Sequence, residues 1–179
     1  MDLKGSKTEQ NLWAAFSGES QARNKYSYFA SQADKEGLKQ IAAIFLETAD
    51  NEKEHAKRFY KFLMGGSVPG TEENLLDAAE GENEEHTNMY PEFEKIAREE
   101  GFDEIADIFH EIAEVEEEHE KRFRKLLANI KANTVFKKDK AVKWKCRNCG
   151  YIHEGTEAPE ECPACAHPQS YYEVLAENY

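Results

Sequence analysis

The feature that most constrains this fold is an internal repeat of helical sequence. Residues 36–63 and 100–127 align without gaps and share 16 of 28 residues. Both copies carry apolar residues at alternating steps of three and four, which is typical of amphipathic helices. A helix that recurs in this way predicts two similar helical hairpins, and two such hairpins predict a four-helix bundle.

Glycine-containing breaks delimit four helices. Glu36-Gly37, the stretch 65–70 and Glu100-Gly101 separate the periodic runs, and glycine commonly follows the last turn of a helix. The expected helices cover residues 6–35, 38–64, 72–99 and 102–131. The predicted fold class is therefore mainly α. The predicted domains are a bundle over residues 1–135, a linker over 136–143 and a small four-cysteine module over 144–179.

Ionisable residues interrupt each apolar stripe near its middle. Burial of one unpaired carboxylate lowers the stability of a fold by on the order of several kcal/mol. Five carboxylates in one core would also repel each other. No lysine or arginine lies on the stripes to compensate, so bound metal is the expected counter-charge. The seven predicted ligands are Glu19, Glu52, His55, Glu82, Glu85, Glu116 and His119.

The spacing of these residues supports a site for two metal ions. Glu-x-x-His occurs at 52–55 and again at 116–119, in matching places of the repeat. Residues three apart project from one helix face. Two such pairs plus one glutamate from each of two other helices form a known di-iron arrangement of bundles. Mixed carboxylate and imidazole ligands suit iron or manganese.

Other ionisable residues of the second half fall off the stripe. Glu117, Glu118 and Glu120 are expected on a solvated acidic face, because glutamate is abundant on helix surfaces. His86 and His110 are expected on the surface as well. None of these five residues is predicted to bind metal.

The cysteines form two closely spaced pairs near the end of the sequence, Cys146-x-x-Cys149 and Cys162-x-x-Cys165. In a chain whose first ten residues lack the apolar run of a signal peptide, such pairs favour a metal site over disulfides. The spacing alone fits both zinc and iron. The segment is too short to bury a core of its own, so bound metal would supply its stability.

The charge and hydropathy of the sequence limit the kinds of partner that it is expected to bind. The net charge of -13 gives a pI near 5.0, and an acidic surface repels phosphate backbones and anionic lipids. No apolar run approaches membrane-spanning length, so neither nucleic acid nor a membrane is an expected partner. A cytoplasmic location is expected. The sequence also lacks a GxGxxG fingerprint, so it is not expected to bind NAD(P)H itself.

The sequence resembles the rubrerythrins along nearly the whole chain. The resemblance rests on GESQARNKY (18–26), ETADNEKEH (47–55), AEGENEEHTNMYP (79–91), EVEEEHEKRF (114–123) and the CRNCGY…CPAC tail. It implies a ferritin-like di-iron bundle followed by a rubredoxin-like iron domain. It also implies a non-haem peroxidase that reduces hydrogen peroxide in defence against oxidative stress.

The resemblance gives each predicted ligand a role. Glu52 and Glu116 match the carboxylates that bridge the two irons in this family. Glu19 and Glu82 match terminal ligands, and His119 matches a ligand of the iron that Glu82 binds.

Four residues match positions of catalytic importance. Glu85 and His55 match a pair that the family exchanges on one iron when the site is reduced. Oxidation adds positive charge, so an extra carboxylate suits ferric iron and a neutral imidazole suits ferrous iron. Tyr26 and Tyr90 match tyrosines beside the di-iron site, where hydrogen bonds to carboxylate ligands are expected.

The four-cysteine iron is expected to relay electrons from a separate NAD(P)H-linked reductase or a rubredoxin. The resemblance also implies a head-to-tail homodimer, in which the tail of one subunit approaches the bundle of the other. Two alternatives stay open. A ferroxidase or iron-storage protein would share the bundle but needs no relay. A binding protein with a zinc ribbon fits the cysteines but not the acidic charge or the glutamates on the apolar stripes.

Overall fold

The computed structural model describes residues 2–178. It contains two compact units that divide between Pro69 and Gly70. The predicted mainly α class, with a small four-cysteine strand region after the helices, is confirmed.

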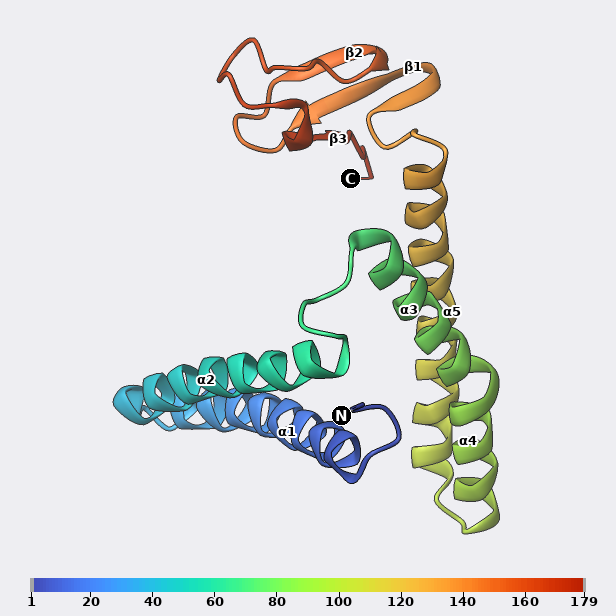
Figure 1. The fold of residues 1–179 in the computed structure, drawn as a ribbon. Coiled ribbons are helices and arrows are strands. Elements are labelled where there is room, and N and C mark those ends of the chain that lie inside the picture. Colours follow the sequence, from blue (N-terminus) through green and yellow to red (C-terminus); the bar gives the residue numbers. More distant parts are fainter. Residues whose placement is uncertain (1, 179) are drawn as a thin grey trace. The chain divides into compact units, whose positions relative to one another are not determined.

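The first unit is a helical hairpin, here the first hairpin, of α1 (Lys7–Lys35) and α2 (Lys39–Leu63). The two helices lie side by side along their length (Figure 1). The Ser6 side chain caps α1 by accepting a hydrogen bond from the backbone amide of Glu9. The break between the helices falls at Gly37, whose φ of 80° suits a residue without a side chain. Leu38 N–H then donates to the Ala33 carbonyl at 2.9 Å and closes the helix end.

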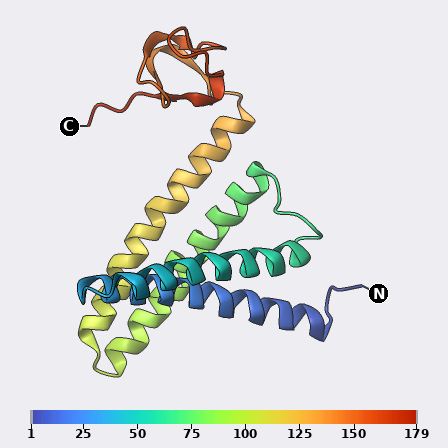
Figure 2. The same cartoon turned by 90° about the vertical axis from the view of Figure 1, so that its left-hand side faces the viewer.

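The second unit begins with a matching hairpin, here the second hairpin. Its helices α3 (Thr71–Glu84) and α4 (Tyr90–Glu99) both pack on α5 (Asp103–Lys131), as Figure 2 shows. Gly101, with a φ of 82°, repeats the break at Gly37. The predicted helix boundaries agree with the observed ones to within one residue.

A π-helical turn, η1 (Glu85–Met89), interrupts the third predicted helix. Tyr90 N–H donates to the Glu85 carbonyl five residues back, and Pro91 has no N–H to continue the α-helical pattern. Such turns accommodate one extra residue and often mark functional sites. Glu19 and Tyr26 are seven residues apart in α1, whereas Glu82 and Tyr90 are eight apart across η1. The π turn absorbs that extra residue.

The cores of the hairpins consist largely of small side chains, which let the helices approach closely. The buried apolar residues of the two hairpins are Ala30, Ala33, Ala42, Ala49, Ala56, Ala79, Ala97, Ala106 and Leu127. Among residues 2–178, every helix is too short or too polar to cross a membrane.

A three-stranded antiparallel sheet follows α5. Its strands β1 (Lys137–Cys146), β2 (Ile152–Glu157) and β3 (Tyr172–Val174) have the order β2-β1-β3, and the short 3-10 helix η2 (Gln169–Tyr171) precedes β3. Residues 137–143, predicted to be a linker, instead form the first part of β1. Lysine-rich composition suggested a linker, but Val142, Trp144 and Cys146 alternate toward one face, as in a half-buried strand. Trp144 anchors the small core and donates its ring N–H to the Gly155 carbonyl.

Candidate metal centres

The first hairpin brings together three of the predicted ligands. Glu19 projects from α1, and Glu52 and His55 project from successive turns of α2. The His55 Nδ1 lies 2.8 Å from Glu52 Oε2 and 3.9 Å from Glu19 Oε1. One ligand atom from each residue lies within 4.8 Å of the other two, which is close enough for all three to contact one metal ion.

The second hairpin repeats this arrangement with Glu82 from α3 and Glu116 and His119 from α5. The His119 Nδ1 lies 2.6 Å from Glu116 Oε2 and 3.6 Å from Glu82 Oε1. These ligand atoms also lie within 4.8 Å of one another. The internal repeat of the sequence therefore appears in the structure as two equivalent groups of ligands.

The electrostatics of both groups fit a bound cation. Burial raises the pKa of Glu19, and a hydrogen bond with Glu52 and its negative charge raise it further. Burial likewise raises the pKa of Glu82, together with the charge of Glu116 and a hydrogen bond with it. Carboxylates crowded in this way repel each other, and a divalent metal ion among them would relieve that repulsion.

Glu85 and Tyr90 stand at the two ends of the π turn. Glu85 is half-buried and lies outside the group formed by Glu82, Glu116 and His119. Burial raises the pKa of Tyr90, and the charges of Glu85, Glu116 and Glu82 raise it further. The Tyr90 hydroxyl therefore stays protonated at neutral pH and faces a strongly negative environment.

The two predicted tyrosines have matching aromatic surroundings. Tyr26 lies 6.2 Å from Phe45, measured between ring centroids, and Tyr90 lies 6.0 Å from Phe109. Phe45 and Phe109 occupy the same place in the repeat, so both hairpins hold a tyrosine ring in the same way.

The prediction that Glu120 and His86 lie on a solvated surface is wrong. Glu120 is 9% exposed and is the one charged residue that is buried within residues 2–178. One of its oxygens accepts from His86 Nε2 at 2.6 Å and from Asn83 Nδ2 at 3.1 Å, and the other accepts from Arg124 Nε at 2.5 Å. These bonds, that of His86 first, lower the pKa of Glu120 to about 2. Glu117 and Glu118 are exposed, as predicted.

The stripe analysis missed Glu120 because it considered each helix alone. Glu120 follows His119 and faces α3 and η1 rather than the stripe. A usable signal existed in the repeat, where Ala56 stands at the position of Glu120. A charged residue that replaces a buried alanine at a matching position indicates a local change in packing.

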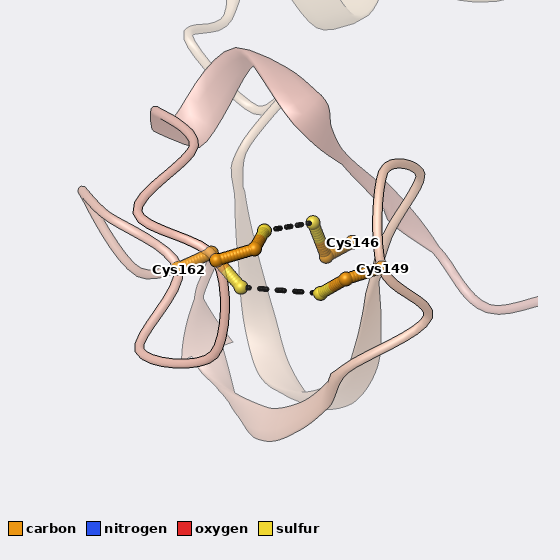
Figure 3. A group of neighbouring side chains, drawn as sticks. Cys146, Cys149 and Cys162 are labelled. Carbon is orange, nitrogen blue, oxygen red and sulfur yellow. Dashed lines mark hydrogen bonds between the residues drawn. The ribbon is translucent and has the colours of Figure 1, made fainter.

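The four cysteines converge in the sheet region, as predicted. Figure 3 shows the two knuckles facing each other, with Cys146 Sγ 3.8 Å from Cys165 Sγ and Cys149 Sγ 3.7 Å from Cys162 Sγ. Disulfide sulfurs would be about 2.0 Å apart. Thiolates bound tetrahedrally at about 2.3 Å from one ion would be separated by about 3.8 Å. The observed spacing therefore fits a four-thiolate metal site.

Fold and sites together define a class of protein. A helical protein with paired carboxylate and imidazole ligands, followed by a four-thiolate module, is a non-haem metalloprotein of the di-iron type. Comparison with models of protein families identifies one family. The rubrerythrin model matches residues 10–127, and the model of the rubredoxin-like domain of rubrerythrin matches residues 144–173.

Known proteins are similar in sequence to this chain over nearly its full length. The chain is 55% identical to rubrerythrin of Nitratidesulfovibrio vulgaris, with 99% of this chain and 98% of that protein covered. It is also 55% identical to rubrerythrin-1 of Clostridium acetobutylicum, with the same coverage. A solved structure of fully reduced nigerythrin covers 97% of this chain and 91% of that one, with 32% identity and a TM-score of 0.37.

The chain therefore belongs to the rubrerythrin family. Membership confirms the predicted class, a ferritin-like helical protein with a rubredoxin-like domain. It also confirms the predicted cofactors, a di-iron site and an iron held by four cysteines, and makes the protein an oxidoreductase of an oxidative-stress family.

Proposed function

We propose that this protein is a peroxidase that reduces hydrogen peroxide to water at a di-iron site. The observation that carries the proposal is the pair of equivalent ligand groups, one in each hairpin. Neither group alone offers enough carboxylates for two irons. The two groups together contain four glutamates and two histidines, and Glu85 is a fifth carboxylate.

Each ligand has a distinct task in this proposal. Glu52 and Glu116 would hold both metal ions, and Glu19 and Glu82 would each hold one of them. His119 binds beside Glu82, which its position 3.6 Å from that carboxylate supports.

Glu85 would hold the other metal ion in its oxidised state, and His55 would hold it in its reduced state. Four carboxylates balance the charge of two ferrous ions, and the fifth balances part of the charge that oxidation adds. Glu85 is half-buried, and the His55 side chain is 57% exposed although its Nδ1 lies 2.8 Å from Glu52 Oε2.

Peroxide reduction consumes two electrons and two protons and yields two molecules of water. When bound, two ferrous ions supply both electrons at once. The Tyr90 hydroxyl lies near the carboxylates of Glu85, Glu116 and Glu82 and can donate its proton to a peroxide oxygen that becomes basic as the O–O bond breaks. Tyr26 occupies the matching place in the first hairpin.

The four cysteines would hold an iron, which would supply electrons to the di-iron site one at a time. We propose that a separate NAD(P)H-linked reductase or a rubredoxin reduces that iron. A head-to-tail homodimer would bring the rubredoxin-like domain of one subunit to the di-iron site of the other. A cytoplasmic location fits these partners.

Anaerobic reaction of the reduced, iron-loaded protein with one equivalent of hydrogen peroxide tests this function. Rapid oxidation of the di-iron site, with peroxide consumed and little hydroxyl radical released, is the expected result. Slow oxidation by peroxide but fast oxidation by oxygen would contradict it and indicate a ferroxidase. Iron uptake far beyond three atoms per chain would indicate storage, and zinc in the native four-cysteine site would remove the relay.

The variant Glu85→Ala tests the role of the fifth carboxylate. It should slow the reaction with peroxide and change the absorption of the oxidised di-iron site. Glu84→Ala is the matched control, because Glu84 is exposed and adjacent. Equal rates and spectra for both variants would contradict the exchange between Glu85 and His55.

A further inference from the structure

Every proposed ligand contributed by α3 and η1, and the histidine ligand of α5, has a sequence neighbour in the hydrogen-bond network around Glu120. The neighbouring pairs are Glu82–Asn83, Glu85–His86 and His119–Glu120. Successive helical residues point about 100° apart. The ligands therefore lie on one face, while the network lies on the adjacent face, where α3 and η1 meet α5.

The network crosses from the π turn to α5. His86 is the second residue of the π turn, and its Nε2 lies 2.6 Å from the Glu120 carboxylate. The side chains of His86 and Glu120 are 15% and 12% exposed, so water competes little for this contact. Arg124 holds the opposite oxygen of Glu120 and fixes the orientation of the carboxylate.

A π turn needs such a restraint. Its hydrogen bonds are less favourable than those of an α-helix, so π turns are rare and short. Within η1 and its flanks, the bond from Tyr90 N–H to the Glu85 carbonyl has the π pattern. The contact between His86 and Glu120 links the turn to α5 from outside the helix.

We infer that Glu120 is a positioning residue: through His86 it holds the π turn in place and thereby sets the location of Glu85 relative to Glu82 and His119. The inference rests on the proposed function, since it concerns the use of Glu85 as a ligand. With the backbone held, Glu85 changes its ligation by rotation of its side chain alone.

The first hairpin lacks any such network. Ala56 replaces Glu120, and Ser20, which matches Asn83, donates instead to the Phe16 carbonyl of its own helix at 2.7 Å. The first hairpin also has no π turn and no ligand equivalent to Glu85. The network and the extra ligand therefore occur together, in one hairpin of the two.

Three variants of the full, iron-loaded chain test the inference. Glu120→Gln leaves one acceptor oxygen where three donors need two. His86→Ala removes the link to the π turn, and His86→Gln restores a donor of similar reach. Glu117→Gln is the control, since Glu117 lies one turn earlier on α5, is exposed and pairs with Lys121.

Two readouts separate positioning from support of the fold. The first is the absorption spectrum of the oxidised di-iron site, and the second is the rate of its oxidation by peroxide. Glu120→Gln and His86→Ala should keep the iron content, alter the spectrum and lower the rate about 10- to 100-fold. His86→Gln should recover most of both, and Glu117→Gln should match the parent protein.

The outcomes distinguish this inference from the proposed function. A parent protein that does not react with peroxide would contradict the function, while the spectra would still test the positioning. Unchanged spectra and rates in His86→Ala would overturn the inference. So would a His86→Gln variant as impaired as His86→Ala. Should Glu120→Gln fail to fold, the two His86 variants decide the question.

Discussion

The two hairpins carry equivalent groups of proposed ligands, but different side chains pack behind these groups. In the first hairpin, Ala56 follows the histidine ligand, and the rings of Phe16 and Tyr60 pack beside it with centroids 5.5 Å apart. An open pocket of about 460 Å³ remains over this region. The first hairpin thus depends on aromatic packing at this place.

In the second hairpin, charged side chains occupy two of the three positions that match this packing. Glu120 stands where the first hairpin has Ala56, and Ala79 and Arg124 match its two aromatic residues. A buried carboxylate is tolerated there because three donors bind it. The comparison teaches that equivalent ligand groups do not require equivalent support. The hairpin with the additional proposed ligand, Glu85, is the one whose support is polar and directional.

The largest expected effect comes from removing the two carboxylates that are proposed to bridge the metal ions, one in each hairpin. Glu52→Ala and Glu116→Ala should both abolish binding of the iron pair and lower peroxide turnover by more than about 100-fold, which exceeds the usual cost of residues behind the ligands. The four-cysteine iron should remain visible in the absorption spectrum of both. Metal analysis checks this result. Retention of two irons by only one variant would break the equivalence of the hairpins.

The comparison can be tested directly by replacing the residues behind the second group with those of the first hairpin. The triple variant Ala79→Phe, Glu120→Ala, Arg124→Tyr should fold with a free energy of unfolding within about 2 kcal/mol of the parent, since charge is exchanged for apolar volume. Its oxidation by peroxide should slow about 10- to 100-fold, because His86 loses its partner. Denaturant unfolding and stopped-flow absorbance measure the two effects. A fully active variant would show that polar support is dispensable.

The tyrosines offer a smaller contrast. Tyr90→Phe should slow oxidation by peroxide about tenfold, because the lost hydroxyl lies among carboxylates of the proposed site. Tyr26→Phe should have a weaker effect, because the first hairpin has no counterpart of Glu85. Both changes keep the ring packing, so melting temperatures should barely move. A larger loss in Tyr26→Phe would reverse the assignment of the proton-holding tyrosine.

The smallest expected effects concern the starts of the two hairpins. Ser6→Ala removes the side-chain cap of α1 and should lower the free energy of unfolding by about 1 kcal/mol. Gly70 is the N-cap residue of α3 and has no side chain that could accept a hydrogen bond there. Gly70→Ser should therefore raise the free energy of unfolding by about a few tenths of a kcal/mol. Urea unfolding measures both. If both variants changed the free energy of unfolding equally and in the same direction, the two N-caps would not differ in this way.

Local patterns accounted for most of the fold and for the grouping of the proposed ligands. The boundaries of the helices followed from periodicity and from glycine breaks, which act within a few residues. The groups around His55 and His119 followed from spacing, because residues three apart must share a helix face. The four cysteines followed from two short motifs. The ligand groups of the two hairpins could be predicted because the sequence repeats.

The remaining features depended on partners distant in the sequence. The burial of Glu120 is decided by His86 and Asn83, which lie more than thirty residues earlier. Strand β1 is decided by pairing with β2 and β3, despite its lysines.

The sequence by itself therefore determined which candidate ligands lie together in each hairpin, because their spacing is a property of a single helix. Only the tertiary structure decided that a glutamate beside a ligand is buried and linked to the π turn. A side chain off the apolar stripe is solvated or buried according to what the neighbouring helix places against it.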